Sequence, residues 1–150
     1  MFKHSTCILL LFSLTLYSCK NDPDTLFESI NNKTTGINFQ NTLFEDGPLN
    51  VANYIYFYNG GGVAIGDINN DGLPDILFTG NMVRNRLFLN KGNFKFEDIT
   101  QKAGVAGKRD WSTGATFADV NGDGLLDIYV CNSGDVEGDD KENELFINNG

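Results

Sequence analysis

Residues 67–75 read DINNDGLPD and residues 119–127 read DVNGDGLLD, so an acid-rich stretch of nine residues occurs twice, 52 positions apart (119 minus 67). In both copies, oxygen-bearing side chains stand at the first, third, fifth and ninth places, and glycine stands at the sixth. A polar turn favours Asp, Asn and Gly for backbone reasons, but it does not require this spacing twice. The repeated pattern therefore predicts two cation-binding loops.

The spacing fits the coordination chemistry of Ca²⁺. This hard cation takes about six to eight oxygen ligands, and a tightly curled loop turns alternate side chains inward. Glycine at the sixth place suits a sharp turn with positive φ, and the absence of His and Cys from both loops makes zinc and copper a poor match. The predicted ligands are Asp67, Asn69, Asp71, Asp75 and the carbonyl of Leu73 in the first loop, and Asp119, Asn121, Asp123, Asp127 and the carbonyl of Leu125 in the second.

The flanking sequence separates these loops from EF-hands, which look similar in the first half of the loop. An EF-hand requires a bidentate Glu at the twelfth place, where this chain has Phe78 and Val130. Pro74 also disfavours a helix that starts at Leu73. Dockerin-like loop-helix units fail for the same reason, so we expect a strand on each side of each loop.

The similarity between the two copies extends beyond the loops. Residues 62–67 (GVAIGD) align with 114–119 (GATFAD), and residues 85–90 (NRLFLN) align with 143–148 (NELFIN). The second pair is 58 positions apart (143 minus 85), so the second copy carries six extra residues, which we place in a surface loop near 134–142. Self-similarity at a fixed period predicts a repeat fold.

The chain as a whole reads as strands and turns. No segment shows a sustained helical period, and short apolar runs alternate with Gly and Asn turns, which predicts many short antiparallel strands. The aromatic run at 54–58 (YIYFY) and the alternation at Ile37 and Phe39 predict two of them. Because no counterpart of the strand expected at 93–99 follows Gly150, we expect the sequence to be the N-terminal fragment of a longer protein.

A strand, a D-x-N-x-D-G-x-x-D loop and a second strand, repeated about every fifty residues, resemble the FG-GAP/VCBS repeats of integrin-like β-propellers. Residues 59–81 and 85–105 also resemble VCBS-repeat lipoproteins, relatives of cartilage acidic protein, which often carry a C-terminal ASPIC/UnbV domain. The resemblance implies an all-β fold, a β-propeller of antiparallel four-stranded blades, with Ca²⁺ in the loop of each blade that carries the motif. About two blades, incomplete, would occupy residues 36–150.

The N-terminal residues predict export and lipidation. The apolar or uncharged stretch 7–17 (CILLLFSLTLY) is shorter than the roughly 20 residues that span a bilayer and fits a secretory signal. Residues 16–19 (LYSC) resemble the lipobox of bacterial lipoproteins, which implies cleavage before Cys19 and lipidation of that residue; an ordinary signal peptide is the alternative. We expect a lipoprotein signal peptide at 1–18, a flexible polar tether at 19–35, secretion across the inner membrane, and an outer-membrane lipid anchor at Cys19.

Charge and composition limit the possible functions. Twenty acidic residues outweigh eleven basic ones, so no nucleic-acid partner is expected. The single His, His4, lies in the expected signal peptide, which leaves the mature chain without the commonest general base. We therefore expect a cell-surface or outer-membrane lipoprotein, not an enzyme, whose calcium-braced propeller binds a glycan or protein partner. The alternative is a propeller-scaffold hydrolase or lyase that acts on polysaccharide with catalytic residues outside this sequence.

Aromatic residues offer further candidate ligand contacts. These are Trp111 and the three tyrosines Tyr54, Tyr56 and Tyr58. Aromatic side chains with this placement more often pack between strands or blades than bind a ligand. We therefore expect Trp111 to be a packing residue.

Overall fold

The computed structural model describes residues 25–45, 47, 49–108, 111–133 and 141–150. The expected signal peptide, Cys19 and the first part of the expected tether lie outside the described residues, as does most of the expected insertion at 134–142. Within the described ranges, none of the helices has the length and apolar character needed to cross a membrane.

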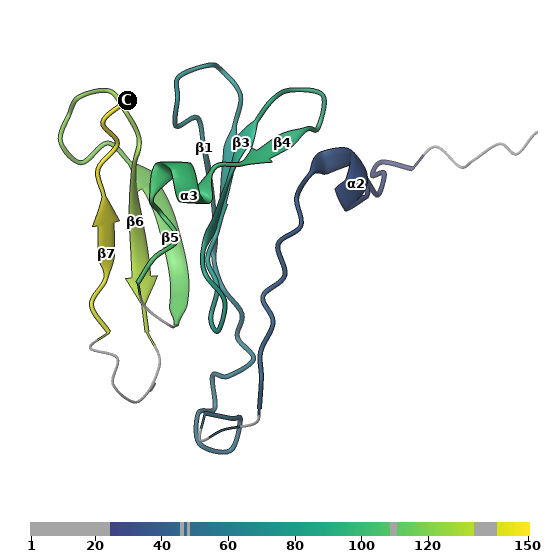
Figure 1. The fold of residues 1–150 in the computed structure, drawn as a ribbon, viewed down its shortest axis with the longest axis vertical. Coiled ribbons are helices and arrows are strands. Elements are labelled where there is room, and N and C mark those ends of the chain that lie inside the picture. The colour runs from purple at the N-terminus through teal and green to yellow at the C-terminus, as the bar shows by residue number, and fades with distance from the viewer. Residues whose placement is uncertain (1–24, 46, 48, 109–110, 134–140) are drawn as a thin grey trace, which may run out of the picture.

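The described residues form two antiparallel sheets, shown in Figure 1. In each sheet the strands lie side by side in chain order. The prediction of short antiparallel strands is confirmed, with four strands in the first copy and three in the second. The first sheet contains β1 (Val63–Gly66), β2 (Asp75–Phe78), β3 (Arg86–Asn90) and β4 (Phe96–Asp98), and the second contains β5 (Ser112–Ala118), β6 (Asp127–Asn132) and β7 (Glu144–Phe146).

Two single-turn helices, α2 (Asn32–Thr35) and α3 (Thr100–Ala103), flank the first sheet in sequence. Each ends at a glycine with positive φ, Gly36 at 78° and Gly104 at 71°. Glycine adopts this conformation without the steric cost that a Cβ brings, which explains where both helices stop. One turn is too short to produce a helical period, so sequence periodicity did not reveal either helix.

The two copies are structural repeats. Gly66 pairs with Asp75 at the loop end of β1 and β2, and Ala118 pairs with Asp127 at the loop end of β5 and β6. Each acid-rich loop therefore connects two neighbouring antiparallel strands at the same place in its sheet. The strand-loop-strand prediction is confirmed for both copies.

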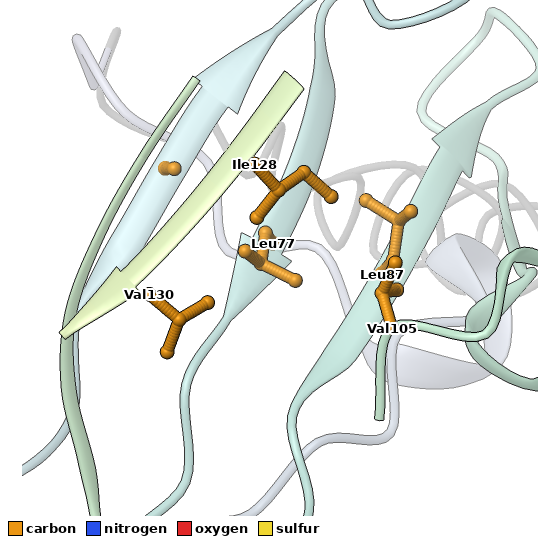
Figure 2. Packing of buried hydrophobic residues seen from close by; sticks show 6 residues of the cluster. Leu77, Leu87, Val105, Ile128 and Val130 are labelled. Carbon is orange, nitrogen blue, oxygen red and sulfur yellow. The ribbon is translucent and has the colours of Figure 1, made fainter. Parts of the chain in front are cut away.

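The hydrophobic core lies between the two sheets. Figure 2 shows Leu77 and Leu87 of the first sheet pointing toward Ile128 and Val130 of the second. Burying a side chain of this size contributes about 1.5–3 kcal/mol, so this contact is the main force that holds the two repeats together. The buried cluster consists of Ala64, Leu77, Leu87, Val105, Ile128 and Val130.

The aromatic run at 54–58 does not form the expected strand. It forms turns, in which the N–H of Phe57 donates to the carbonyl of Tyr54 at 3.0 Å. These turns place Tyr54 and Phe57 against Trp111, with ring centroids 5.4 and 5.6 Å apart. Trp111 is only 2% exposed, which confirms that it is a packing residue.

The segment around Ile37 and Phe39 is not a strand either. It runs along the first sheet, where the Phe39 ring stacks on Phe78 with centroids 5.1 Å apart. Further along, the side-chain oxygen of Asn41 accepts the N–H of Asn81 at 2.9 Å. The segment is held by side chains rather than by strand pairing, so β-propensity predicted its apolar contacts but not its backbone.

Candidate metal centre

In the first loop, the carboxylate of Asp67 holds the turn together. One oxygen accepts the N–H of Asp71 at 3.0 Å, and the other accepts the N–H of Gly72 at 2.7 Å. The chain reaches these positions through positive φ values at Asn70 (56°) and Gly72 (84°). Gly72 is therefore needed for its backbone freedom, as the sequence predicted.

The second loop repeats this arrangement. The carboxylate of Asp119 accepts the N–H groups of Gly122 at 2.7 Å and Gly124 at 2.9 Å. The φ values at these two glycines are 77° and 86°, at the same fourth and sixth places as in the first loop. The two loops therefore share the same backbone conformation at these places.

The third and fifth places also match between the loops. Asn69 donates through its amide to Asp71 at 2.9 Å, and Asn121 donates to Asp123 at 2.8 Å. All four of these residues are exposed. The other oxygen of each fifth-place carboxylate accepts the N–H of the seventh residue at 2.9 Å, from Leu73 in the first loop and Leu125 in the second.

The ninth-place carboxylates differ from the others because they are fully buried. Asp75 and Asp127 are both 0% exposed. Asp75 accepts the N–H of Ile68 at 3.0 Å and of Asn90 at 2.7 Å. Asp127 accepts the corresponding N–H groups, from Val120 at 3.0 Å and Asn148 at 2.8 Å. Each ninth-place carboxylate thus ties its loop to the end of the third strand of its own sheet, at Asn90 in β3 and at Asn148 two residues after β7.

Sequence reasoning missed Asn90 and Asn148 as parts of the site. The amide of Asn90 donates to the carbonyl of Pro74 at 2.9 Å, and that of Asn148 donates to the carbonyl of Leu126 at 3.2 Å. Each side chain therefore fixes the loop carbonyl just before the ninth-place carboxylate. The signal was present in the aligned stretches NRLFLN and NELFIN, whose last residue is the same Asn, but alignment alone does not say what that Asn contacts.

The loops concentrate negative charge. Burial raises the pKa of the Asp75 carboxyl above its ordinary value; the N–H groups of Asn90 and Ile68 oppose the rise, and the charges of Asp71 and Asp67 add to it. In the second loop the N–H of Gly124 contributes most to lowering the pKa of Asp119. A cation placed among such carboxylates would stabilise their charged forms.

The residue types of both loops fit Ca²⁺. At all the predicted places, the side-chain atoms that could bind the ion are hard oxygens. An oxygen that accepts one N–H retains a second lone pair for a cation. In the described part of the chain, however, no three His, Cys, Asp or Glu side chains are close enough together to hold a metal ion. Binding therefore requires the oxygen ligands of each loop to come closer together than they lie in this structure.

Comparison with known proteins agrees with this repeat structure. Residues 67–130, which include both loops, match the FG-GAP-like repeat family. Over 76 residues the chain is 40% identical to Cartilage acidic protein 1 of Xenopus tropicalis, an alignment that covers 50% of this chain and 12% of the relative. The chain thus spans a small part of the length of that relative. Residues 67–130 are therefore an FG-GAP-like repeat domain, and the chain is a distant homologue of cartilage acidic protein 1.

Proposed function

We propose that this chain is part of a calcium-braced β-propeller that presents a binding surface to a glycan or protein partner. The observation that supports this proposal is the shared plan of the two loops. At the first, fifth and ninth places, both loops hold their carboxylates with backbone N–H groups of the same loop or sheet. Two loops with the same oxygen donors in the same backbone conformation are suited to binding the same kind of ion.

Calcium is the ion that we propose for both loops, and its role is structural. When bound, it would neutralise the clustered carboxylates and stiffen the connection between two strands. Four side-chain oxygens and one carbonyl from each loop would hold it. These are the predicted ligands Asp67, Asn69, Asp71, Asp75 and Leu73, and Asp119, Asn121, Asp123, Asp127 and Leu125.

The propeller is supported by the outer faces of the two sheets. On the face of the first sheet that points away from the core, Val63 is 53% exposed and Ile65 is 66% exposed. On the second sheet, Leu145 is 49% exposed beside Tyr129. Blades of a propeller bury both faces against neighbouring blades. Further blades on both sides would cover these apolar side chains.

A binding role is favoured over catalysis by the way in which the buried carboxylates are held. Asp75 and Asp127 each accept two backbone N–H groups, so neither is placed to exchange a proton with a substrate. The exposed carboxylates of the loops would be engaged with the ion. We therefore propose that the propeller is a scaffold for recognition.

The proposed cellular context is a bacterial cell surface or outer membrane, with Cys19 as the lipidated residue. We expect Cys19→Ser to abolish incorporation of a labelled fatty acid during expression in a bacterium that processes lipoproteins. Cys131→Ser is the matched control, because Cys131 lies in β6 and is not a candidate for acylation. Undiminished labelling of the Cys19→Ser protein would contradict the anchor.

Calorimetric calcium titration, combined with melting curves in calcium and in EDTA, tests the metal proposal. At free calcium tenfold above the dissociation constant, each site should stabilise the fold by about 1.4 kcal/mol, because binding to the native state alone shifts the folding equilibrium. We expect at least two sites and a calcium-dependent rise in melting temperature. The double variant Asp71→Ala with Asp123→Ala is the control. It should show neither calcium binding at these two loops nor the rise in melting temperature that this binding causes.

The same samples test partner recognition. Binding of the full-length protein to a glycan array should be stronger in calcium than in EDTA, and the double variant should bind weakly under both conditions. Equal melting temperatures of the unaltered protein in calcium and in EDTA would contradict the calcium proposal.

A further inference from the structure

The two loops contact each other across the boundary between the repeats. The side-chain amide of Asn148, at the end of the second repeat, donates to the carbonyl of Ile68 in the first loop at 2.8 Å. In the opposite direction, the side-chain amide of Asn70 in the first loop donates to the carbonyl of Gly124 in the second at 3.2 Å. The repeats are thus joined by polar contacts at the loops as well as by the apolar core.

One of these contacts lies on a continuous path between the two buried carboxylates. The N–H of Asn148 donates to Asp127 at 2.8 Å, while its side chain holds the carbonyl of Ile68. The N–H of Ile68 in turn donates to Asp75 at 3.0 Å. Asn148 and Ile68 therefore link the ninth-place carboxylate of one loop to that of the other through three hydrogen bonds.

Within the described residues, the counterparts of Asn148 and Asn70 make no contact of this kind. Asn90, the counterpart of Asn148, directs its amide to Pro74 of its own loop, as Asn148 does to Leu126, and makes no contact with the other loop. Gly122 is the counterpart of Asn70 and has no side chain with which to reach a neighbouring loop. The two inter-repeat contacts thus come from positions whose counterparts lack them, which provides matched controls within the chain.

We propose that calcium binding at the two loops is positively coupled, with Asn148 as the positioning residue that transmits the effect and Asn70 as a second contact. This inference rests on the proposed calcium function. An ion bound at Asp127 fixes the carboxylate that holds Asn148, and Asn148 then fixes the peptide that leads into Asn69. The first loop consequently loses less freedom when it binds its own ion, and this is how ordering at one site favours binding at another.

The coupling is measured by calcium titration of the full-length protein and of two single-loop variants. Asp71→Ala disables the first loop and Asp123→Ala disables the second. We define the coupling factor as the product of the two affinities in the unaltered protein divided by the product of the two single-loop affinities. This factor should be about five, at the lower end of typical coupling between sites. Coupling is reciprocal, so each loop should gain by the same factor when the other is occupied.

Three further variants identify the residues that carry the coupling. Asn148→Ala retains the backbone N–H that Asp127 accepts but removes the side-chain donor to Ile68 and to Leu126 of its own loop. The second loop should therefore bind more weakly, and the coupling factor should fall close to one. Asn70→Gly gives the first loop the residue of the second and tolerates the positive φ at this position, so the factor should fall partly. Asn90→Ala is the matched control; it should weaken the first loop itself without changing the factor between the loops.

Amide hydrogen exchange gives a second readout that does not depend on affinity. In the Asp71→Ala protein, where only the second loop binds calcium, added calcium should slow exchange at Ile68 in the first loop. This effect should disappear when Asn148→Ala is added.

The outcomes separate the two proposals. No calcium binding by the unaltered protein would overturn the calcium function and this inference with it. Binding at both loops with a factor of one would overturn the coupling alone. A fivefold factor that persists in Asn148→Ala would overturn the role of Asn148.

Discussion

Asp75→Ala is expected to lower the free energy of unfolding by about 4 kcal/mol in EDTA, where calcium makes no contribution. The carboxylate is fully buried and accepts the N–H groups of Ile68 and Asn90. Alanine leaves both donors without their partner, and each such loss costs about 1–3 kcal/mol. The small cavity that replaces the carboxylate adds to this cost. Urea denaturation in EDTA measures the change directly.

Asp71→Ala is the control that separates a structural carboxylate from one that serves only the ion. Asp71 belongs to the same loop, but it is exposed, and its partners are Asn69 and Leu73 on the same turn. Its replacement should cost below about 1 kcal/mol in EDTA, as is usual for surface positions. In calcium, both variants should lose the stabilisation from the first loop. Equal losses for the two variants in EDTA would show that Asp75 has no structural role of its own.

The loops could be predicted from the sequence because the features that define them are local. The contacts of Asp67 with Asp71 and Gly72 span four and five residues, so the spacing of the nine letters already specifies them. The contact between Asn90 and Asp75 spans 15 residues, and that between Asn148 and Asp127 spans 21. Only the pairing of the strands brings these residues together, and the spacing of a motif does not report it.

The aromatic run at 54–58, in contrast, has a backbone conformation that the sequence did not predict. Its residues favour strands by propensity, but β-propensity largely reflects packing on a half-buried surface. Here Tyr54 and Phe57 pack against Trp111 from a series of turns instead of along a sheet, and Tyr56 and Tyr58 are exposed. The sequence showed that this segment is rich in apolar side chains. Its backbone conformation, however, depends on contacts with a residue more than fifty positions away.

Gly62→Ala should lower the free energy of unfolding by an amount similar to that expected for Asp75→Ala, because it disturbs the contact between the two repeats. A Cβ at Gly62 would lie 2.6 Å from the carbonyl oxygen of Thr113 and 2.9 Å from the Cα of Gly114. Both neighbours are backbone atoms of the second sheet, so no side-chain rotation can relieve the overlap. The hydroxyl of Thr79 occupies the same narrow space, where it accepts the N–H of Gly62 at 2.6 Å and donates to the carbonyl of Thr113 at 2.9 Å.

The added methyl group must therefore push β1 and β5 apart. Overpacking a core ordinarily costs about 1–3 kcal/mol, and here the displacement also separates Leu77 from Val130, so we expect a loss of at least about 3 kcal/mol. Gly47→Ala is the matched control, since a Cβ at Gly47 meets no atom within 4 Å. Thermal melting of the two variants in EDTA measures the difference. An unchanged melting temperature for Gly62→Ala would mean that the sheets do not approach each other this closely in solution, and the inter-repeat contacts of Asn70 and Asn148 would lose their structural basis at the same time.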